Sequence, residues 1–241
     1  MGANAQIAVP SFTAGQVLTA AQQTQINTGI PVFATTVTRD AAFGGTGEKV
    51  LAQGQYAYIE ATSTLQVYTG SAWVTAGGGL TYITQATPTA VNTVSINNCF
   101  TSTYANYFIV IDVTAAVGTG VVSARLRLSG TDASTNYASQ RVGGQATTVY
   151  ASSNIAGTDE FYFGGIEGTP AGYGWQMNLL SPALARATVG IGTSGYPSAG
   201  GSVVEHVWNN HTTATAYDGI TVMFTGTSFT GTIRVYGYQN S

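Results

Sequence analysis

The sequence predicts an all-β protein in which a short N-terminal helix and a small β-meander precede a jelly-roll-like β-sandwich. Short runs rich in valine, isoleucine, threonine and tyrosine recur along the chain, with turn residues between them. Glycine accounts for 31 of the 241 residues, and a single segment has the features of a helix. Because no repeat of about 20–50 residues is visible, a sandwich or jelly roll is favoured over a propeller or solenoid.

The predicted helix covers residues 20–27 and follows Thr19, which is a good N-cap residue. Gly29 and Pro31 are typical of residues that end a helix. Its apolar stripe consists of three residues, Leu18, Ile26 and Ile30. Such a narrow stripe does not hold a lone helix together, so we expect this segment to dock on a partner or on copies of itself.

A small β-meander is predicted after the helix. Its strands are expected at residues 32–37, 55–60, 65–68 and 72–74, with a turn-rich loop over residues 39–49. A meander of this size buries little apolar surface by itself, so we expect oligomer contacts here too.

The glycine run at residues 77–79 marks the clearest domain boundary. The chain is therefore divided into an attachment segment (1–30), a β-meander module (31–76), a glycine linker (77–79) and a distal β-sandwich domain (80–241). Distal strands are expected at residues 81–85, 91–96, 107–114, 121–128, 147–151, 160–163, 174–180, 187–191, 203–208, 219–224 and 232–238. Residues 107–113 are nearly apolar on both faces, which indicates a central strand.

Several side chains are predicted to be buried in the distal domain. Phe108, Phe161 and Trp175 are expected in its core. Cys99 is the single cysteine, so an intrachain disulfide is excluded, and beside Phe100 it is expected to act as a small buried apolar residue.

Charged side chains are scarce, with 7 basic and 10 acidic residues and a formal net charge of -3. The charged fraction is 7%, whereas an ordinary soluble domain has about 25%. The negative balance and the scattered arginines argue against nucleic-acid and membrane partners. Arg125 and Arg127 are two positions apart in a predicted strand and are expected to share one solvated face. The sequence starts without a secretion signal yet is polar and nearly uncharged, a combination typical of virion proteins.

Three carboxylates, Asp159, Glu160 and Glu167, are the candidates for a glycosidase pair, which must flank the scissile bond. Asp159 and Glu160 are adjacent and would point to opposite faces of a strand. We therefore interpret them as a solvated loop edge and assign no catalytic residue.

The candidate metal ligands are Glu205, His206 and His211. Strand alternation places Glu205 and His206 on opposite faces, and His211 is expected in a turn, so no metal site is assigned. An ion bound by three copies of one histidine on a trimer axis stays open as an alternative. Residues 132–136 resemble a calcium loop but lack its bidentate glutamate, and residues 44–49 lack the spacing of a phosphate loop, so no cofactor is assigned.

Aromatic residues are the remaining signal, since the chain has 14 tyrosines. Tyr173 and Tyr196 lie between glycines or next to proline, where exposed loops are expected, and Arg141 is near glycines. Rigid tyrosines on loops suit saccharide or protein recognition with little charge. These three residues are predicted to contact a receptor, the alternative being that the tyrosines cap the edge of the core.

The segment from Ser11 to Ala20, the run Thr38-Arg39-Asp40-Ala41, Gly54–Tyr58 and Val67–Trp73 together resemble the N-terminal part of bacteriophage fibre and minor structural proteins. The resemblance covers about residues 11–76. The distal part also resembles the jelly-roll-like ends of such fibres, on Phe100, Tyr104–Tyr107, Leu126–Leu128 and Gly130–Asp132.

This resemblance implies a non-enzymatic homotrimer on the virion. Residues 1–30 would bind other virion proteins, and the distal domain of a tail fibre would contact a host surface glycan or protein during adsorption. A head fibre or capsid decoration protein is the first alternative, and a small polysaccharide depolymerase is the second.

Overall fold

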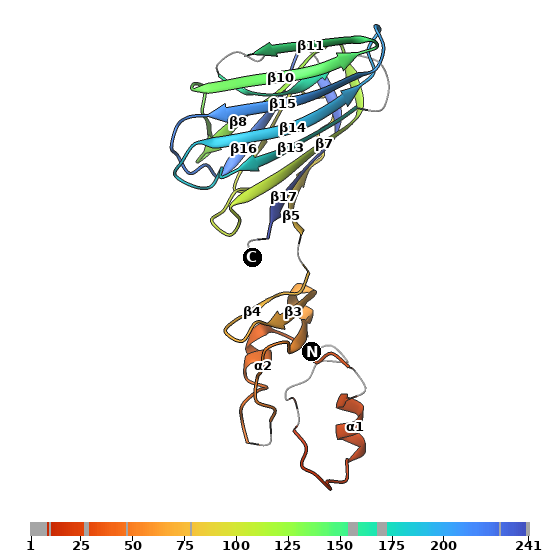
Figure 1. Cartoon of the computed structure of the whole chain (residues 1–241), viewed down its shortest axis with the longest axis vertical. Helices are drawn as coiled ribbons and strands as arrows, with labels where there is room; N and C mark the ends of the chain where they lie inside the picture. The colour runs from red at the N-terminus through yellow and green to blue at the C-terminus, as the bar shows by residue number, and fades with distance from the viewer. Residues whose placement is uncertain are drawn as a thin grey trace. The chain divides into compact units, whose positions relative to one another are not determined.

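The computed structural model describes residues 9, 11–26, 29–46, 48–77, 79–153, 159–167, 173–226 and 228–239. The chain forms two compact units, residues 1–78 and residues 79–241, and the boundary between them in the sequence falls within the predicted glycine linker (Figure 1). No helix among the described residues is long and apolar enough to cross a membrane.

The predicted N-terminal helix is confirmed as α1 (Ala20–Ile26). Thr19 forms a capping box with Gln22, because the Gln22 backbone N–H donates to Thr19 Oγ1 at 3.3 Å and the Thr19 N–H donates to Gln22 Oε1 at 3.0 Å. The neighbouring apolar residues Val17 and Leu18 are exposed, as the narrow stripe predicts.

The rest of the N-terminal unit is a four-stranded sheet in the order β1-β2-β3-β4. The strands are β1 (Val32–Phe33), β2 (Tyr56–Ile59), β3 (Thr64–Tyr68) and β4 (Trp73–Thr75), with a 3-10 turn at Glu60–Thr62. Only the β1–β2 pair is parallel. A small core of Phe33, Ala42, Ala57 and Ile59 holds it together.

One sequence prediction for this unit is wrong. The expected strand over residues 32–37 stops at Phe33, and the chain instead forms helix α2 (Thr36–Asp40). Thr35 and Thr38 make a capping box that starts this helix, which overrides the strand propensity of the β-branched residues. Arg39 of α2 is buried and lies 4.7 Å above the Trp73 ring.

The C-terminal unit is a β-sandwich, as predicted. Its larger sheet has eight strands in the order β11-β10-β15-β14-β13-β7-β17-β5. They are β5 (Leu80–Ala86), β7 (Asn106–Val117), β10 (Tyr137–Gln145), β11 (Thr148–Ser153), β13 (Tyr173–Leu180), β14 (Thr188–Tyr196), β15 (Val203–His211) and β17 (Ser228–Tyr238). All neighbouring strands pair antiparallel.

The smaller sheet has the order β12-β8-β16-β6, with β9 paired to β8. Its strands are β6 (Thr93–Ile96), β8 (Gly120–Leu128), β9 (Thr131–Asp132), β12 (Phe161–Ile166) and β16 (Gly219–Thr225). One core joins both sheets and includes Trp175 from the larger sheet and Phe161 from the smaller one, as predicted. Cys99 is buried in this core as well.

Two predictions about the sandwich need correction. Strand β10 was not expected, because its sequence is rich in serine, glutamine and glycine. Phe108 was assigned to the core, but it is only half-buried and lies on the outer face of the larger sheet. The strand that carries it, β7, does lie inside the sheet between β13 and β17, as expected.

Candidate functional site

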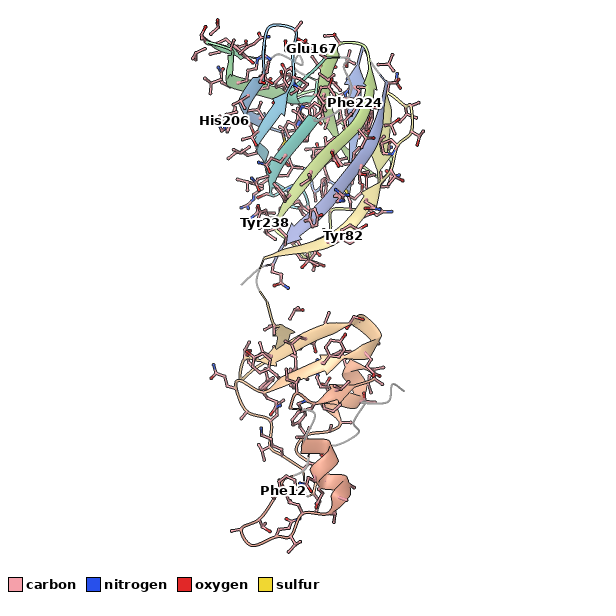
Figure 2. All side chains as sticks on the ribbon, turned by 90° about the vertical axis from the view of Figure 1, so that its right-hand side faces the viewer. Phe12, Tyr82, Glu167, His206, Phe224 and Tyr238 are labelled. Atoms are coloured by element: carbon pink, nitrogen blue, oxygen red, sulfur yellow. The ribbon has the colours of Figure 1, made fainter. Side chains whose placement is uncertain are left out.

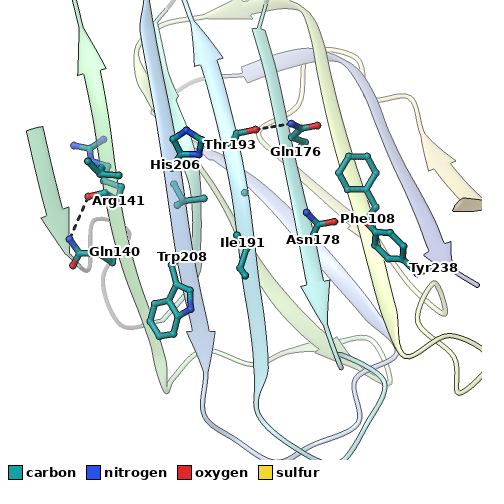
Figure 3. Close-up of a pocket in the computed structure, with 13 residues that line it drawn as sticks. Phe108, Gln140, Arg141, Gln176, Asn178, Ile191, Thr193, His206, Trp208 and Tyr238 are labelled. Atoms are coloured by element: carbon teal, nitrogen blue, oxygen red, sulfur yellow. Dashed lines mark hydrogen bonds between the residues drawn. The ribbon is translucent and has the colours of Figure 1, made fainter. Parts of the chain in front are cut away.

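The outer face of the eight-stranded sheet carries an open hollow of about 530 Å³ (Figure 3). Because side chains alternate along a strand, every second residue of β15, β14 and β13 points to this face. On β15 these residues are Val204, His206, Trp208 and Asn210. We call this space the main hollow.

Strand register forms one row of side chains across the sheet, and all of its members except Tyr236 and Tyr82 line the main hollow. Its members come from seven strands and are paired in register: Gln140, Trp208, Ile191, Asn178, Phe108, Tyr236 and Tyr82. Ring contacts continue the row at one end, since the Tyr236 ring lies 6.4 Å from Phe108 and 6.0 Å from Tyr82. Trp208, at 45% exposure, presents its indole at the other end. This aromatic row combines large ring surfaces with amide groups.

A second row lies one step along the same strands. Here His206, Thr193 and Gln176 are neighbours in register. Gln176 Nε2 donates to Thr193 Oγ1 at 2.8 Å, and in the aromatic row the Tyr238 hydroxyl donates to Asn178 Oδ1. These bonds orient both amides across the hollow, and Figure 3 shows the one between Gln176 and Thr193. Each amide keeps a second polar atom that makes no further bond within the described residues, so each can bind a ligand hydroxyl.

The main hollow carries almost no charge. Arg141 is the single ionic residue among the described residues that line it, and its guanidinium bonds to Glu205 on the inner side of the sheet. His206 is exposed and projects from the outer face (Figure 2). A site of this kind suits an uncharged, hydroxyl-rich ligand.

A buried polar cluster lies on the inner side of the same sheet. Glu205 is fully buried and accepts hydrogen bonds from Arg141 Nη1 at 2.5 Å, the Tyr150 hydroxyl at 3.0 Å and the Tyr162 hydroxyl at 3.0 Å. Ser194 Oγ adds a bond at 3.2 Å. Burial, followed by the bond to Glu205, raises the pKa of Tyr150 to about 12. The cluster ties β10, β11, β12, β14 and β15 together.

The three predicted receptor contacts are not in exposed loops. Tyr173 begins strand β13, is 2% exposed and stacks on Trp175 with 5.9 Å between ring centroids. Tyr196 ends β14 half-buried against the core, where burial and then Glu205 raise its pKa. Arg141 belongs to the buried cluster. The alternative interpretation of the tyrosines, at the edge of the core, fits the structure, because each side chain faces inward on its strand.

The three candidate metal ligands all belong to strand β15. Glu205 and His206 lie on opposite faces of β15, as predicted. His211 was expected in a turn, but it ends β15, is buried, and shares a 2.6 Å hydrogen bond with the Tyr217 hydroxyl.

The two adjacent carboxylates do not point to opposite sides, contrary to the prediction. Arg125 Nη2 lies 2.6 Å from Asp159 Oδ2 and 3.8 Å from Glu160 Oε2. They precede β12 rather than belonging to a strand, so strand alternation does not apply. The Glu167 carboxylate has other partners, since it accepts hydrogen bonds from Ser198 Oγ at 2.8 Å and from the Ala199 N–H at 2.9 Å.

Of the residues that line the main hollow, sequence reasoning named Arg141 as a receptor contact and gave His206 and Phe108 other roles, and it missed the rest. Two signals were available. Residues 107–113 are apolar on both faces, although one of those faces is the outer one, and β15 places Trp208 on the same side as His206. Neither signal shows which strands are neighbours in the sheet, and the main hollow forms only because of that strand order.

No protein-family model matches this chain, and no curated protein or solved structure is significantly similar to it. The interpretation of the site therefore depends on its geometry.

Proposed function

We propose that the chain is a non-enzymatic adhesion protein of the phage-fibre type, whose sandwich binds a saccharide of the host surface in the main hollow. The observation that carries this proposal is the aromatic row, in which the exposed Trp208 ring lies in register with the amides of Gln140 and Asn178 through Ile191. The volume of about 530 Å³ lies within the range of about 300–1,000 Å³ of small-molecule sites.

The chemistry of a sugar ring matches this row. A sugar has C–H groups on its ring faces and hydroxyls around its edge. An indole binds the apolar face, while an amide offers a donor and an acceptor to neighbouring hydroxyls. Because ionic groups play little part in such contacts, binding should depend weakly on salt.

The virion setting of the proposal rests on the sequence resemblance of residues 11–76. The N-terminal unit adds a physical reason for a partner, because its apolar residues Val17, Val37 and Val50 are 88%, 75% and 76% exposed. Exposed apolar side chains favour docking on another protein. We propose that this unit attaches the fibre to other virion proteins as a homotrimer.

Tail fibre is our first choice, with a head fibre or capsid decoration protein as the alternative. Immunogold labelling of intact virions separates these two locations. A depolymerase has less support, because no Asp or Glu is among the described residues that line the main hollow. Release of reducing ends from host surface glycans by the purified chain would revive that possibility.

The test of binding uses Trp208→Ala in the full chain. We expect the purified wild-type chain to bind an array of bacterial surface glycans and to block adsorption of the phage. Trp208→Ala should weaken glycan binding by about tenfold or more, since a large aromatic contact contributes on the order of 2 kcal/mol. Val117→Ala is the control, because Val117 is also an exposed apolar residue, at 74% exposure against 45% for Trp208, but lies at the end of β7. Equal binding by both variants would contradict the proposal.

A further inference from the structure

A second hollow of about 440 Å³ adjoins the main one on the same face of the sheet. The two share Gln176, Thr193 and His206 in their linings, so they form one continuous surface. The second hollow extends over the part of β13 and β14 where Gly174 and Gly195 are paired in register.

These two glycines differ from others in the sheet. A Cβ added at Gly174 would meet nothing within 4 Å, and one at Gly195 would come no closer than 3.9 Å to the Val203 carbonyl oxygen. At Gly192, by contrast, a Cβ would lie 2.5 Å from the Gln176 carbonyl oxygen. Neither Gly174 nor Gly195 has a positive φ. Packing and backbone geometry therefore explain Gly192, but they do not explain the other two.

Glycine inside a strand destabilises it, because the backbone is free in the unfolded chain and no side chain packs on its neighbours. Two paired glycines on the open face therefore destabilise the sheet, although neither packing nor backbone geometry requires glycine at these positions. Their effect is to leave a floor of bare backbone in the second hollow. Backbone that a ligand must approach closely is a setting in which glycine is required.

A carboxylate stands beside this floor. Asp112 of β7 is paired in register with Gly174 and is exposed, and its carboxylate makes no hydrogen bond or ion pair within the described residues. Arg234 lies one step further along the face, opposite Val110. Glu205 also borders the second hollow, but its carboxylate is buried on the inner side of the sheet and paired with Arg141. Asp112 is therefore the outward-facing carboxylate nearest the glycine pair in register, and it should repel an anionic group placed on that floor.

We propose that Gly174 and Gly195 open a second sugar subsite, so that one neutral oligosaccharide extends from Trp208 over His206 onto the glycine floor, and that Asp112 selects against acidic sugars there. This inference rests on the proposed saccharide function and deepens it, since it states the length and the charge of the ligand. The continuity of the two hollows favours an extended chain over a single sugar.

The test compares wild-type chain with Gly174→Val and Gly195→Val on an array of neutral oligosaccharides, from monosaccharides to octasaccharides, together with their uronic-acid counterparts. Wild type should bind the longer neutral chains at least about tenfold better than the monosaccharides. Each valine should abolish that length preference and leave monosaccharide binding unchanged. Melting temperatures should stay level or rise, because valine suits an outward strand position. Gly174→Ala is the smaller variant, to be used if valine disturbs folding.

Asp112→Asn provides the charge test. It should raise binding of the acidic oligosaccharides and leave the neutral ones unchanged. If wild type binds with dependence on Trp208 but the valine variants keep the length preference, the second subsite is wrong and the saccharide function stands. If wild type binds no array member, both fail. Self-association of wild type that the valine variants abolish would show that a second copy of the chain occupies this floor instead.

Discussion

Glu205 and His206 are adjacent in the sequence, but their side chains serve opposite faces of the eight-stranded sheet. Glu205 is fully buried against Arg141 and Tyr162, whereas His206 is exposed and lines both hollows. One strand, β15, thus carries a stabilising cluster on its inner side and candidate ligand contacts on its outer side. Stability and binding should therefore respond to different substitutions.

Replacing Glu205 by glutamine should destabilise the sandwich by about 3 kcal/mol, because Arg141 would keep its charge without its counter-ion in a partly buried site. Chemical denaturation measures the change. His206→Gln is the control on the same strand and should stay within about 0.5 kcal/mol, since its side chain is exposed. Similar effects of both substitutions would show that the cluster contributes little.

Stability should fall as the pH drops through about 6.5, the ordinary pKa of histidine. Burial lowers the pKa of His211 in the folded chain, so below that pH the unfolded state binds more protons than the folded state. Above it the contribution is constant. Denaturation curves at neutral and mildly acidic pH should show a smaller difference in His211→Gln than in wild type. An unchanged pH dependence in that variant would assign the effect to other groups.

The Cys99 thiol should be unreactive in the folded chain. Burial raises its pKa to about 12, so the nucleophilic thiolate is scarce at neutral pH, and the side chain is out of reach of reagents. Labelling with a thiol-reactive disulfide should proceed only at the rate at which the sandwich opens, and denaturant should accelerate it. Rapid labelling of native protein would contradict this placement.

The full chain should scatter light as a trimer, while residues 79–241 alone should fold with unchanged melting behaviour. The core that joins the two sheets lies entirely within that range, so the sandwich has what it needs for folding. Deleting residues 1–30 should remove the protein from virions and leave the sandwich intact. A stable monomer of the full chain with an ordered N-terminal unit would refute the assembly proposal.

Local rules were sufficient for the elements with strong signals. Thr19 indicates the start of α1, because its hydroxyl accepts a hydrogen bond from a backbone N–H in the first turn of the helix. Alternation along residues 203–208 places Glu205 and His206 on opposite faces of the strand. Local rules did not predict β10, because its strand propensity is weak and pairing with β11 and β15 supplies the backbone hydrogen bonds. They failed again at Tyr173, where flanking glycines suggested a loop but stacking on Trp175 buries the ring.

The sequence by itself determined the all-β class, the break at the glycine run and the two faces of β15, because these depend on neighbouring residues. The tertiary structure alone decided which strands are adjacent. Gln140, Asn178 and Trp208 are far apart in the chain, and the order β10-β15-β14-β13 brings them into one row. Strand order and register arise from long-range pairing and core packing, which no local pattern encodes.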